Sequence, residues 1–203
     1  MYLTTVPFGA QKERSVTRLS KIWFCSDWHF NHDKPFIYLP RGYNSIEEMN
    51  KDIVNKHNSK VRKDDLVFCL GDCCMGGAEK NAENERLIES LNGKIVIIRG
   101  NHDGKRKIEM YQNCKNVVGV VSAYYLDYKK YSFLLTHHPS LTGNRDEHKP
   151  LKGRLINLAG HTHTDDPFND IGLGTIYHVE MDAHGCFPID IDSIIEDCKK
   201  KGL

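Results

Sequence analysis

The sequence is organised around the stretch Lys94-Ile95-Val96-Ile97-Ile98-Arg99-Gly100-Asn101-His102-Asp103. Four β-branched residues in succession, 95–98, are typical of a strand that is buried on both faces of a sheet. The polar cluster 100–103 therefore begins where the predicted strand leaves the core, and functional side chains often gather at such strand ends. An amide, an imidazole and a carboxylate in succession offer a metal ligand, a proton donor and a group that could orient the imidazole.

Four further polar clusters have the same local arrangement, each following a strand-like apolar run. These clusters are Asp27-Trp28-His29, Gly71-Asp72, His137-His138 and Gly160-His161-Thr162-His163. In chain order the polar series reads D-x-H, G-D, G-N-H-D, H and G-H-x-H. The tetrapeptide 100–103 is a weak signal alone, and its recurrence in this series makes it a strong one.

Size and composition predict a single globular domain over residues 1–203, with residues 1–20 as an N-terminal extension. The chain has 39% hydrophobic and 27% charged residues, and no linker rich in Pro, Gly or Ser divides it. Twenty-eight Lys and Arg against 27 Asp and Glu give a formal charge of +1. Such a balance disfavours a long nucleic acid as a partner, because non-specific binding to nucleic acid depends on a large positive charge.

The sequence also predicts a cytoplasmic protein without a membrane partner. Residues 1–20 lack the basic-then-apolar pattern of a signal peptide, and no apolar run is long enough to cross a bilayer. The chain has seven cysteines, an odd number, and Cys25 and Cys69 lie within apolar strand patterns. We therefore expect reduced thiols rather than a disulfide framework.

The clearest helix signal is a capping box, in which Ser45 precedes Glu48 by three residues at the start of a helix predicted over 46–59. Further helices are expected up to residue 92, with Gly93 after the end, over 107–112, and from 192 or 193 to 201. Strands are expected over 66–70, 117–126, 131–136, 154–158 and 175–181. An edge hairpin with its turn at Pro7-Phe8-Gly9 is expected within residues 1–20.

The polar series, which extends from about residue 21 to residue 163, closely resembles that of the calcineurin-like metallophosphoesterases. The segments Ser26-Asp27-Trp28-His29-Phe30-Asn31-His32 and Arg99-Gly100-Asn101-His102-Asp103 look like the small, cap-less bacterial and phage branch of that family. The resemblance implies an α/β fold, a four-layer sandwich of two mixed β-sheets flanked by helices. The mixed order of predicted helices and strands fits this architecture.

The resemblance implies two divalent metal ions and a set of seven ligands. Mn is the first choice, with Fe, Ni or Zn as alternatives, because Asp, His and Asn donors favour ions of intermediate hardness. The implied ligands are Asp27, His29 and His163 for the first ion, Asn101, His137 and His161 for the second, and Asp72 as the bridge. His161 and His163 alternate along an extended chain, so both rings can face one side.

The implied reaction is hydrolysis of a phosphate mono- or diester by a hydroxide that bridges the two ions. The substrate would be a small phosphate ester or a nucleotide. His102 matches the residue that donates a proton to the leaving alkoxide, and Asp103 could accept the other ring N–H of His102. The oligomeric state is not defined by the sequence.

Several positions have a second interpretation. His137 and His138 compete for one ligand role, and His137 is favoured because it directly follows the apolar run and neighbours on a strand point opposite ways. His32 could contact substrate or only pack in its loop, and Cys73 and Cys74 are interpreted as local packing. The cluster Lys105-Arg106-Lys107 could bind an anion at the start of a short helix or form a solvated loop.

Two other functions compete with the phosphoesterase. A non-catalytic metal-binding scaffold is the first, but such a protein is expected to lose a ligand or the His102 position, and this sequence retains them all. A nuclease acting on short oligonucleotides or cyclic nucleotides is the second. The near-neutral charge and the absence of room for a separate cap domain weigh against an enzyme for long duplexes.

Overall fold

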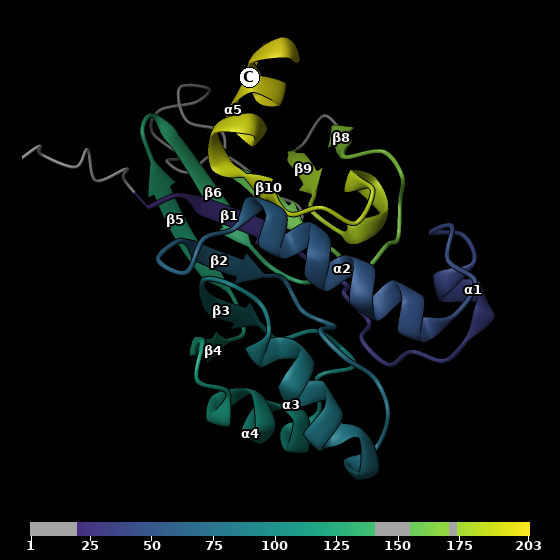
Figure 1. The fold of residues 1–203 in the computed structure, drawn as a ribbon. Helices are drawn as coiled ribbons and strands as arrows, with labels where there is room; N and C mark the ends of the chain where they lie inside the picture. The colour runs from purple at the N-terminus through teal and green to yellow at the C-terminus, as the bar shows by residue number, and fades with distance from the viewer. Residues whose placement is uncertain (1–19, 141–154, 171–173) are drawn as a thin grey trace, which may run out of the picture.

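The computed structural model describes residues 20–140, 155–170 and 174–203, which form two β-sheets with helices around them (Figure 1). The first sheet has the strand order β10-β1-β2-β3-β4. Strands β1 to β4 are parallel, and β10 pairs antiparallel with β1. The strands are β1 (Ile22–Cys25), β2 (Leu66–Cys69), β3 (Lys94–Ile98), β4 (Val117–Val121) and β10 (Ile189–Asp190).

The second sheet has the strand order β5-β6-β7-β9-β8. Strands β6, β7 and β9 are parallel, while β5 and β8 pair antiparallel at the two edges. The strands are β5 (Tyr124–Tyr128), β6 (Tyr131–Leu135), β7 (Leu155–Ala159), β8 (Phe168–Asp170) and β9 (Thr175–His178). The predicted class, two mixed sheets with helices, is confirmed.

The three neighbouring strands β1, β2 and β3 of the first sheet are largely buried on both faces, as their continuous apolar runs predicted. Alternate residues such as Trp23 and Cys25 face the helices, whereas Phe24 and Phe68 face the second sheet. The rings of Phe24 and Phe68 stack with their centroids 5.7 Å apart. Because both faces are covered, the polar residues can leave the sheet only at the strand ends.

The described helices divide between these two faces. Figure 1 shows α2 lying across the first sheet, with α3 and α4 side by side near β4. The helix α5 instead contributes apolar side chains to the core between the sheets. The helices are α1 (Pro35–Tyr38), α2 (Ile46–Lys60), α3 (Asn81–Glu89), α4 (Lys105–Asn113) and α5 (Ile191–Lys200). Among the described residues, none of these helices combines the length and apolar character that a membrane span requires.

The predicted cap of α2 is confirmed. The Ser45 hydroxyl accepts a hydrogen bond from the Glu48 N–H at 3.1 Å. The Glu48 carboxylate accepts from the Asn44 N–H at 2.9 Å, one residue earlier than a standard capping box uses. Both bonds fix where the helix starts, after the turn that separates it from α1.

The single strand predicted over 117–126 is wrong. The chain leaves the first sheet at Val121, and β5 begins at Tyr124 in the second sheet. The strand predicted over 175–181 ends at His178 and is followed by a 3₁₀-helix, Met181–His184. Helix α4 begins at residue 105 rather than 107. The expected hairpin around residues 7–9 and Arg154 lie outside the described residues.

Candidate metal centre

The carboxyl ends of parallel strands from both sheets meet at one place. The loop after β1 runs beside the loop after β2, where the Asp27 N–H donates to the Gly71 carbonyl at 3.0 Å. His137, which follows β6, bonds through its ring Nδ1 to the Leu70 carbonyl at 2.7 Å and so links the two sheets. The Gly160 N–H, after β7, donates to the His137 carbonyl at 3.0 Å. All five polar clusters therefore lie at the carboxyl ends of parallel strands, where the two sheets meet.

Two glycines permit this close approach. A Cβ at Gly100 would overlap the Asp72 carboxyl group, and a Cβ at Gly160 would overlap the side chains of Ser26 and Asp27. Any side chain at either position would displace a candidate ligand. These glycines therefore belong to the site although they offer no ligand atom.

The backbone of the site lies unusually often in the left-handed region. Five of the seven candidate ligands have positive φ angles, between 50° and 77°. They are Asp27, His29, Asp72, His161 and His163. Residues other than glycine reach this region at a cost in free energy, and such residues cluster at functional sites.

The first group of candidate ligands comprises Asp27, His29 and His163, whose ligand atoms lie within 4.8 Å of one another. The Nε2 atoms of His29 and His163 are 3.1 Å apart, and they lie 3.6 and 3.8 Å from Asp27 Oδ1. Asp27 Oδ1 is fully buried and has no hydrogen-bond partner among the described residues. A buried carboxylate oxygen without a partner, facing two imidazole nitrogens, fits a bound cation.

The second group is built on Asp72. Its Oδ1 accepts a hydrogen bond from the His102 N–H at 2.9 Å, and its Oδ2 lies 3.4 Å from His137 Nε2. The same Nε2 is 2.8 Å from the Asn101 Oδ1. Asp27, Asp72 and His137 also form a group within 4.8 Å, so Asp27, which belongs to the first group as well, joins the two groups.

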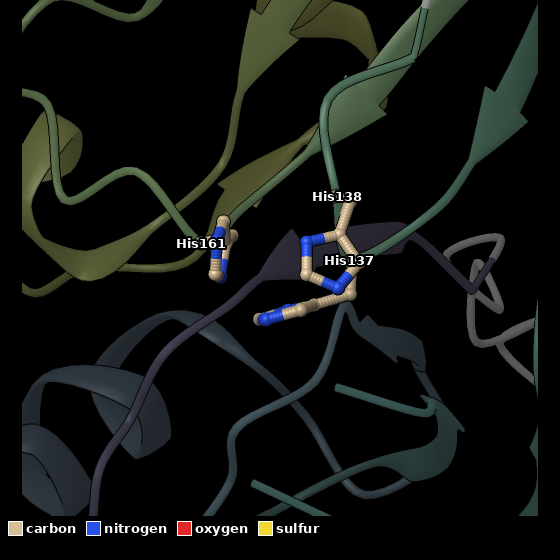
Figure 2. A group of neighbouring side chains, drawn as sticks. All are labelled: His137, His138 and His161. Atoms are coloured by element: carbon tan, nitrogen blue, oxygen red, sulfur yellow. The ribbon is translucent and has the colours of Figure 1, made fainter. Parts of the chain in front are cut away.

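Figure 2 shows a third group, the rings of His137, His138 and His161. The rings of His138 and His161 have centroids 4.3 Å apart. The sequence argument that His138 must point away from His137 fails, because β6 ends at Leu135 and strand alternation stops there. The structure therefore brings His138 to the site together with the favoured His137.

The two central carboxylates are held ionised. Burial raises the pKa of Asp72, but hydrogen bonds from the His137 ring and the His102 N–H more than offset it and lower the pKa to about 2. Burial likewise opposes ionisation of Asp27, and the neighbouring His29 reverses this effect so that the pKa is lowered. Ionised carboxylates are the form that binds cations.

The sequence did not identify the residues that bond to the candidate ligands and to their loops. The Asp182 carboxylate lies 2.9 Å from His163 Nδ1 and 2.7 Å from the Arg41 guanidinium, whose side chain is 1% exposed. Arg41 also donates to the Asp27 carbonyl at 2.9 Å. The buried Glu180 accepts from the Thr162 hydroxyl at 2.8 Å, within the same loop as His163. Asp182 directly follows the strand predicted over 175–181 and opens Asp182-Ala183-His184, which repeats the D-x-H pattern, so a signal for it was present. Glu180 lies within that predicted strand, and the pattern gave no signal for it.

The side chains of His102 and Asp103 have different surroundings. The His102 side chain is 45% exposed at the rim, with Nε2 3.9 Å from Asp72 Oδ2. The Asp103 carboxylate is buried and accepts from the N–H groups of Asp72 and Gly100 and from the Tyr111 hydroxyl. The expected bond from the His102 ring to Asp103 is therefore replaced by bonds that join the loops after β2 and β3.

The basic cluster at the start of α4 is also divided. The Lys107 ammonium donates to the carbonyls of Cys74 and His102 at 2.6 and 3.0 Å. It therefore links two loops of the site, and these bonds occupy the donors that an anion would need. Lys105 and Arg106 are exposed. Cys74 is fully buried and contacts Tyr111, in line with local packing.

Comparisons with known proteins agree over most of the chain. The sequence profile of the calcineurin-like phosphoesterases matches residues 20–173. The uncharacterised protein MJ1445 of Methanocaldococcus jannaschii is 33% identical over an alignment of 186 residues that covers 90% of this chain and 93% of that protein. The Gene 66 protein of Mycobacterium phage L5 is 27% identical over 190 residues, 82% of this chain and 89% of that protein.

A solved structure with the same fold is among the matches. The protein of unknown function AQ665 from Aquifex aeolicus superposes with a TM-score of 0.65 at 20% identity, covering 88% of this chain and 99% of that chain. The profile match includes all seven candidate ligands and ends before Asp182.

Proposed function

The chain belongs to the calcineurin-like phosphoesterases, and from this premise we propose that it hydrolyses phosphate mono- or diesters with two divalent ions bound at the candidate metal centre. Asp27, His29 and His163 would hold one ion, and Asn101, His137 and His161 the other. Asp72 would bridge the two. Mn is the first choice, and Fe, Ni or Zn suit the same donors.

The observation that carries this proposal is the unpartnered Asp27 Oδ1. It is buried within 3.6 and 3.8 Å of the Nε2 atoms of His29 and His163. A buried charged oxygen is costly to leave without a partner, and a cation among these three atoms would remove the cost. When bound, a pair of such ions supplies a nucleophile at neutral pH and neutralises charge on the phosphate group.

The residues of the chain then divide the remaining tasks. His102 lies at the exposed rim, and its backbone N–H is fixed on Asp72 at 2.9 Å. From there its ring would donate a proton to the leaving alkoxide. Asp103 is proposed as a positioning residue, because its carboxylate holds the backbone N–H groups of Asp72 and Gly100.

The cavity over the centre supports a small substrate. Its volume is about 520 Å³, and its lining combines His29, Asp72 and His102 with the apolar Phe36 and Ile37. A volume in this range suits one small molecule. We keep the ester class open between mono- and diesters, and we propose a cytoplasmic setting because all seven thiols are free and buried.

The test is activity after reconstitution with Mn²⁺, using bis-p-nitrophenyl phosphate and p-nitrophenyl phosphate, with metal content measured on the same sample. We expect turnover of at least one ester and close to two ions per chain. Asp72→Asn should remove most of the activity and part of the metal, because both ions lose a shared anionic ligand. The exposed Asp64→Asn is the matched control. Absence of both turnover and metal uptake in the wild-type protein would contradict the proposal.

A further inference from the structure

The cavity over the metal centre has a neighbour of about 570 Å³. The side chains of His32 and Phe36 line both cavities, so these two residues form a shared wall. A ligand with its phosphate at the metal centre that extends into the second cavity therefore passes over this wall. The second cavity is thus a candidate place for the alcohol portion of a phosphate ester.

Hydrogen bonds of buried residues hold this wall in place. His32 is 9% exposed, and its N–H donates to the His29 carbonyl at 3.0 Å. The preceding Asn31 exchanges hydrogen bonds with two other buried asparagines, since its amide donates to Asn84 at 2.8 Å and accepts from Asn50 at 2.8 Å. The His32 Nδ1 is buried without a hydrogen-bond partner among the described residues. This network fixes the position of the wall relative to the ligand His29.

Phe36 is the exposed part of the wall. It is 70% exposed, although the next residue, Ile37, is 8% exposed. Its ring lies 5.5 Å from the His32 ring, in an edge arrangement with an interplanar angle of 75°. Leu39, which directly follows this short helix, is 56% exposed but lines neither cavity. Exposure alone therefore does not distinguish Phe36, whereas its position between the two cavities does.

The second cavity is not suited to a second phosphate. Its charged lining consists of the carboxylates of Asp33, Glu47 and Glu79 and the ammonium groups of Lys34 and Lys80. Both lysines already face carboxylates, because Lys34 lies 3.5 Å from Asp33 and Lys80 lies 2.9 Å from Glu83. The remaining lining includes the apolar Ile46 and Met75. This combination favours an uncharged group with apolar faces.

We propose that the second cavity binds the leaving-group portion of the substrate, and that this portion is an uncharged planar aromatic ring packed on Phe36. The proposal rests on the proposed phosphoesterase function and names the class of alcohol for that same site. Aromatic rings prefer offset or edge contacts with other rings, and an exposed phenylalanine provides both.

The test measures binding of two non-hydrolysable ligands, 2-naphthylmethylphosphonate and methylphosphonate, to the Mn²⁺-loaded protein by calorimetry. They share a phosphonate group and differ in the ring. We expect wild type to bind the naphthyl compound roughly tenfold more tightly, which is near the upper end of what one aromatic pair contributes. Phe36→Ala should abolish this preference and leave methylphosphonate binding within about twofold. Phe36→Trp should retain the preference, and Leu39→Ala should change neither affinity.

Each outcome decides one proposal. Equal affinities of wild type for the two phosphonates, or a Phe36→Ala variant that keeps the preference, would overturn the aromatic subsite. The phosphoesterase function is judged separately, by turnover of the two p-nitrophenyl esters. A protein that turns over either ester without any ring preference would keep its function and lose only the subsite.

Discussion

The carboxylate of Asp182 lies 2.9 Å from Nδ1 of His163 and thereby fixes which nitrogen of that ring faces the metal centre. Burial raises the pKa of Asp182, but hydrogen bonds from His163 and Arg41 outweigh it, so that the pKa is lowered and the group stays ionised. An ionised acceptor at Nδ1 keeps the proton there and leaves the lone pair of Nε2 free to bind.

The first prediction follows from this contact. Asp182→Asn should weaken binding of one Mn²⁺ ion by roughly tenfold or more, because the neutral amide no longer holds the tautomer of His163. Calorimetric titration of the chelator-treated protein measures it. Asp165→Asn, at an exposed position in the loop that carries His163, should bind as wild type. Unchanged affinity in Asp182→Asn would mean that the contact only packs the loop.

The second prediction concerns Gly160. Gly160→Ala should cost about 2 kcal/mol of unfolding free energy and weaken metal binding, because the new Cβ displaces Ser26 and the Asp27 carboxylate. Gly119→Ala is the control, since a Cβ there meets its nearest neighbour at an ordinary 4.0 Å. Urea unfolding in the presence of chelator and metal titration provide the two measurements. If Gly160→Ala were neutral in both, the close approach at the strand ends would be tolerant of a methyl group.

The third prediction separates the lysines of α4. Lys107→Met should lower kcat several-fold, because the carbonyls of Cys74 and His102 lose their shared donor and the His102 loop loosens. Lys105→Met, in the same turn, should leave kcat unchanged. Steady-state kinetics at saturating Mn²⁺ compares them. If both variants lost kcat equally, the effect would come from the positive charge of the cluster and not from the hydrogen bonds of Lys107.

The fourth prediction concerns the pH dependence of stability through His57, which is not one of the candidate ligands. Its Nε2 donates to the Asn92 carbonyl at 2.9 Å, and burial lowers its pKa to about 4 from a value of 6.5. Between these values the unfolded chain binds a proton that the folded protein excludes. Stability from this residue is therefore complete above pH 6.5 and is lost as the pH falls toward 4.

The matched variant is His57→Gln, whose amide can still donate to Asn92. Between pH 7 and pH 5 the unfolding free energy of wild type should fall by about 2 kcal/mol more than that of His57→Gln. Urea unfolding in chelator at the two pH values tests this. Parallel pH curves for the two proteins would show that His57 takes up its proton without unfolding.

The strands around the site could be predicted because their physical signals are local. Residues 95–98 and 22–25 alternate between two apolar environments, and the polar residues begin where those runs stop. The start of α2 was predictable for the same reason, because Ser45 caps the helix that begins at the next residue and bonds to Glu48, three residues along the chain.

The division of residues 117–126 could not be predicted from the sequence. Val121 and Tyr124 are both good strand residues, and the change of sheet between them depends on which partner strand is available. The pairing of the partners of His163 was hidden for a related reason. Arg41 and Asp182 are 141 residues apart, and only the folded chain brings them together.

The left-handed backbone at five of the candidate ligands has a consequence for which substitutions the site can accept. Asp, Asn and His are the residue types other than glycine that adopt this conformation most readily, and they also bind divalent ions. One choice of residue therefore satisfies two independent demands. Exchanging Asp27 or Asp72 for Glu preserves the charge but replaces a residue that adopts the left-handed conformation readily by one that does not. Such an exchange, although it keeps the carboxylate, should therefore disturb both the backbone and the position of the ligand at these strand ends.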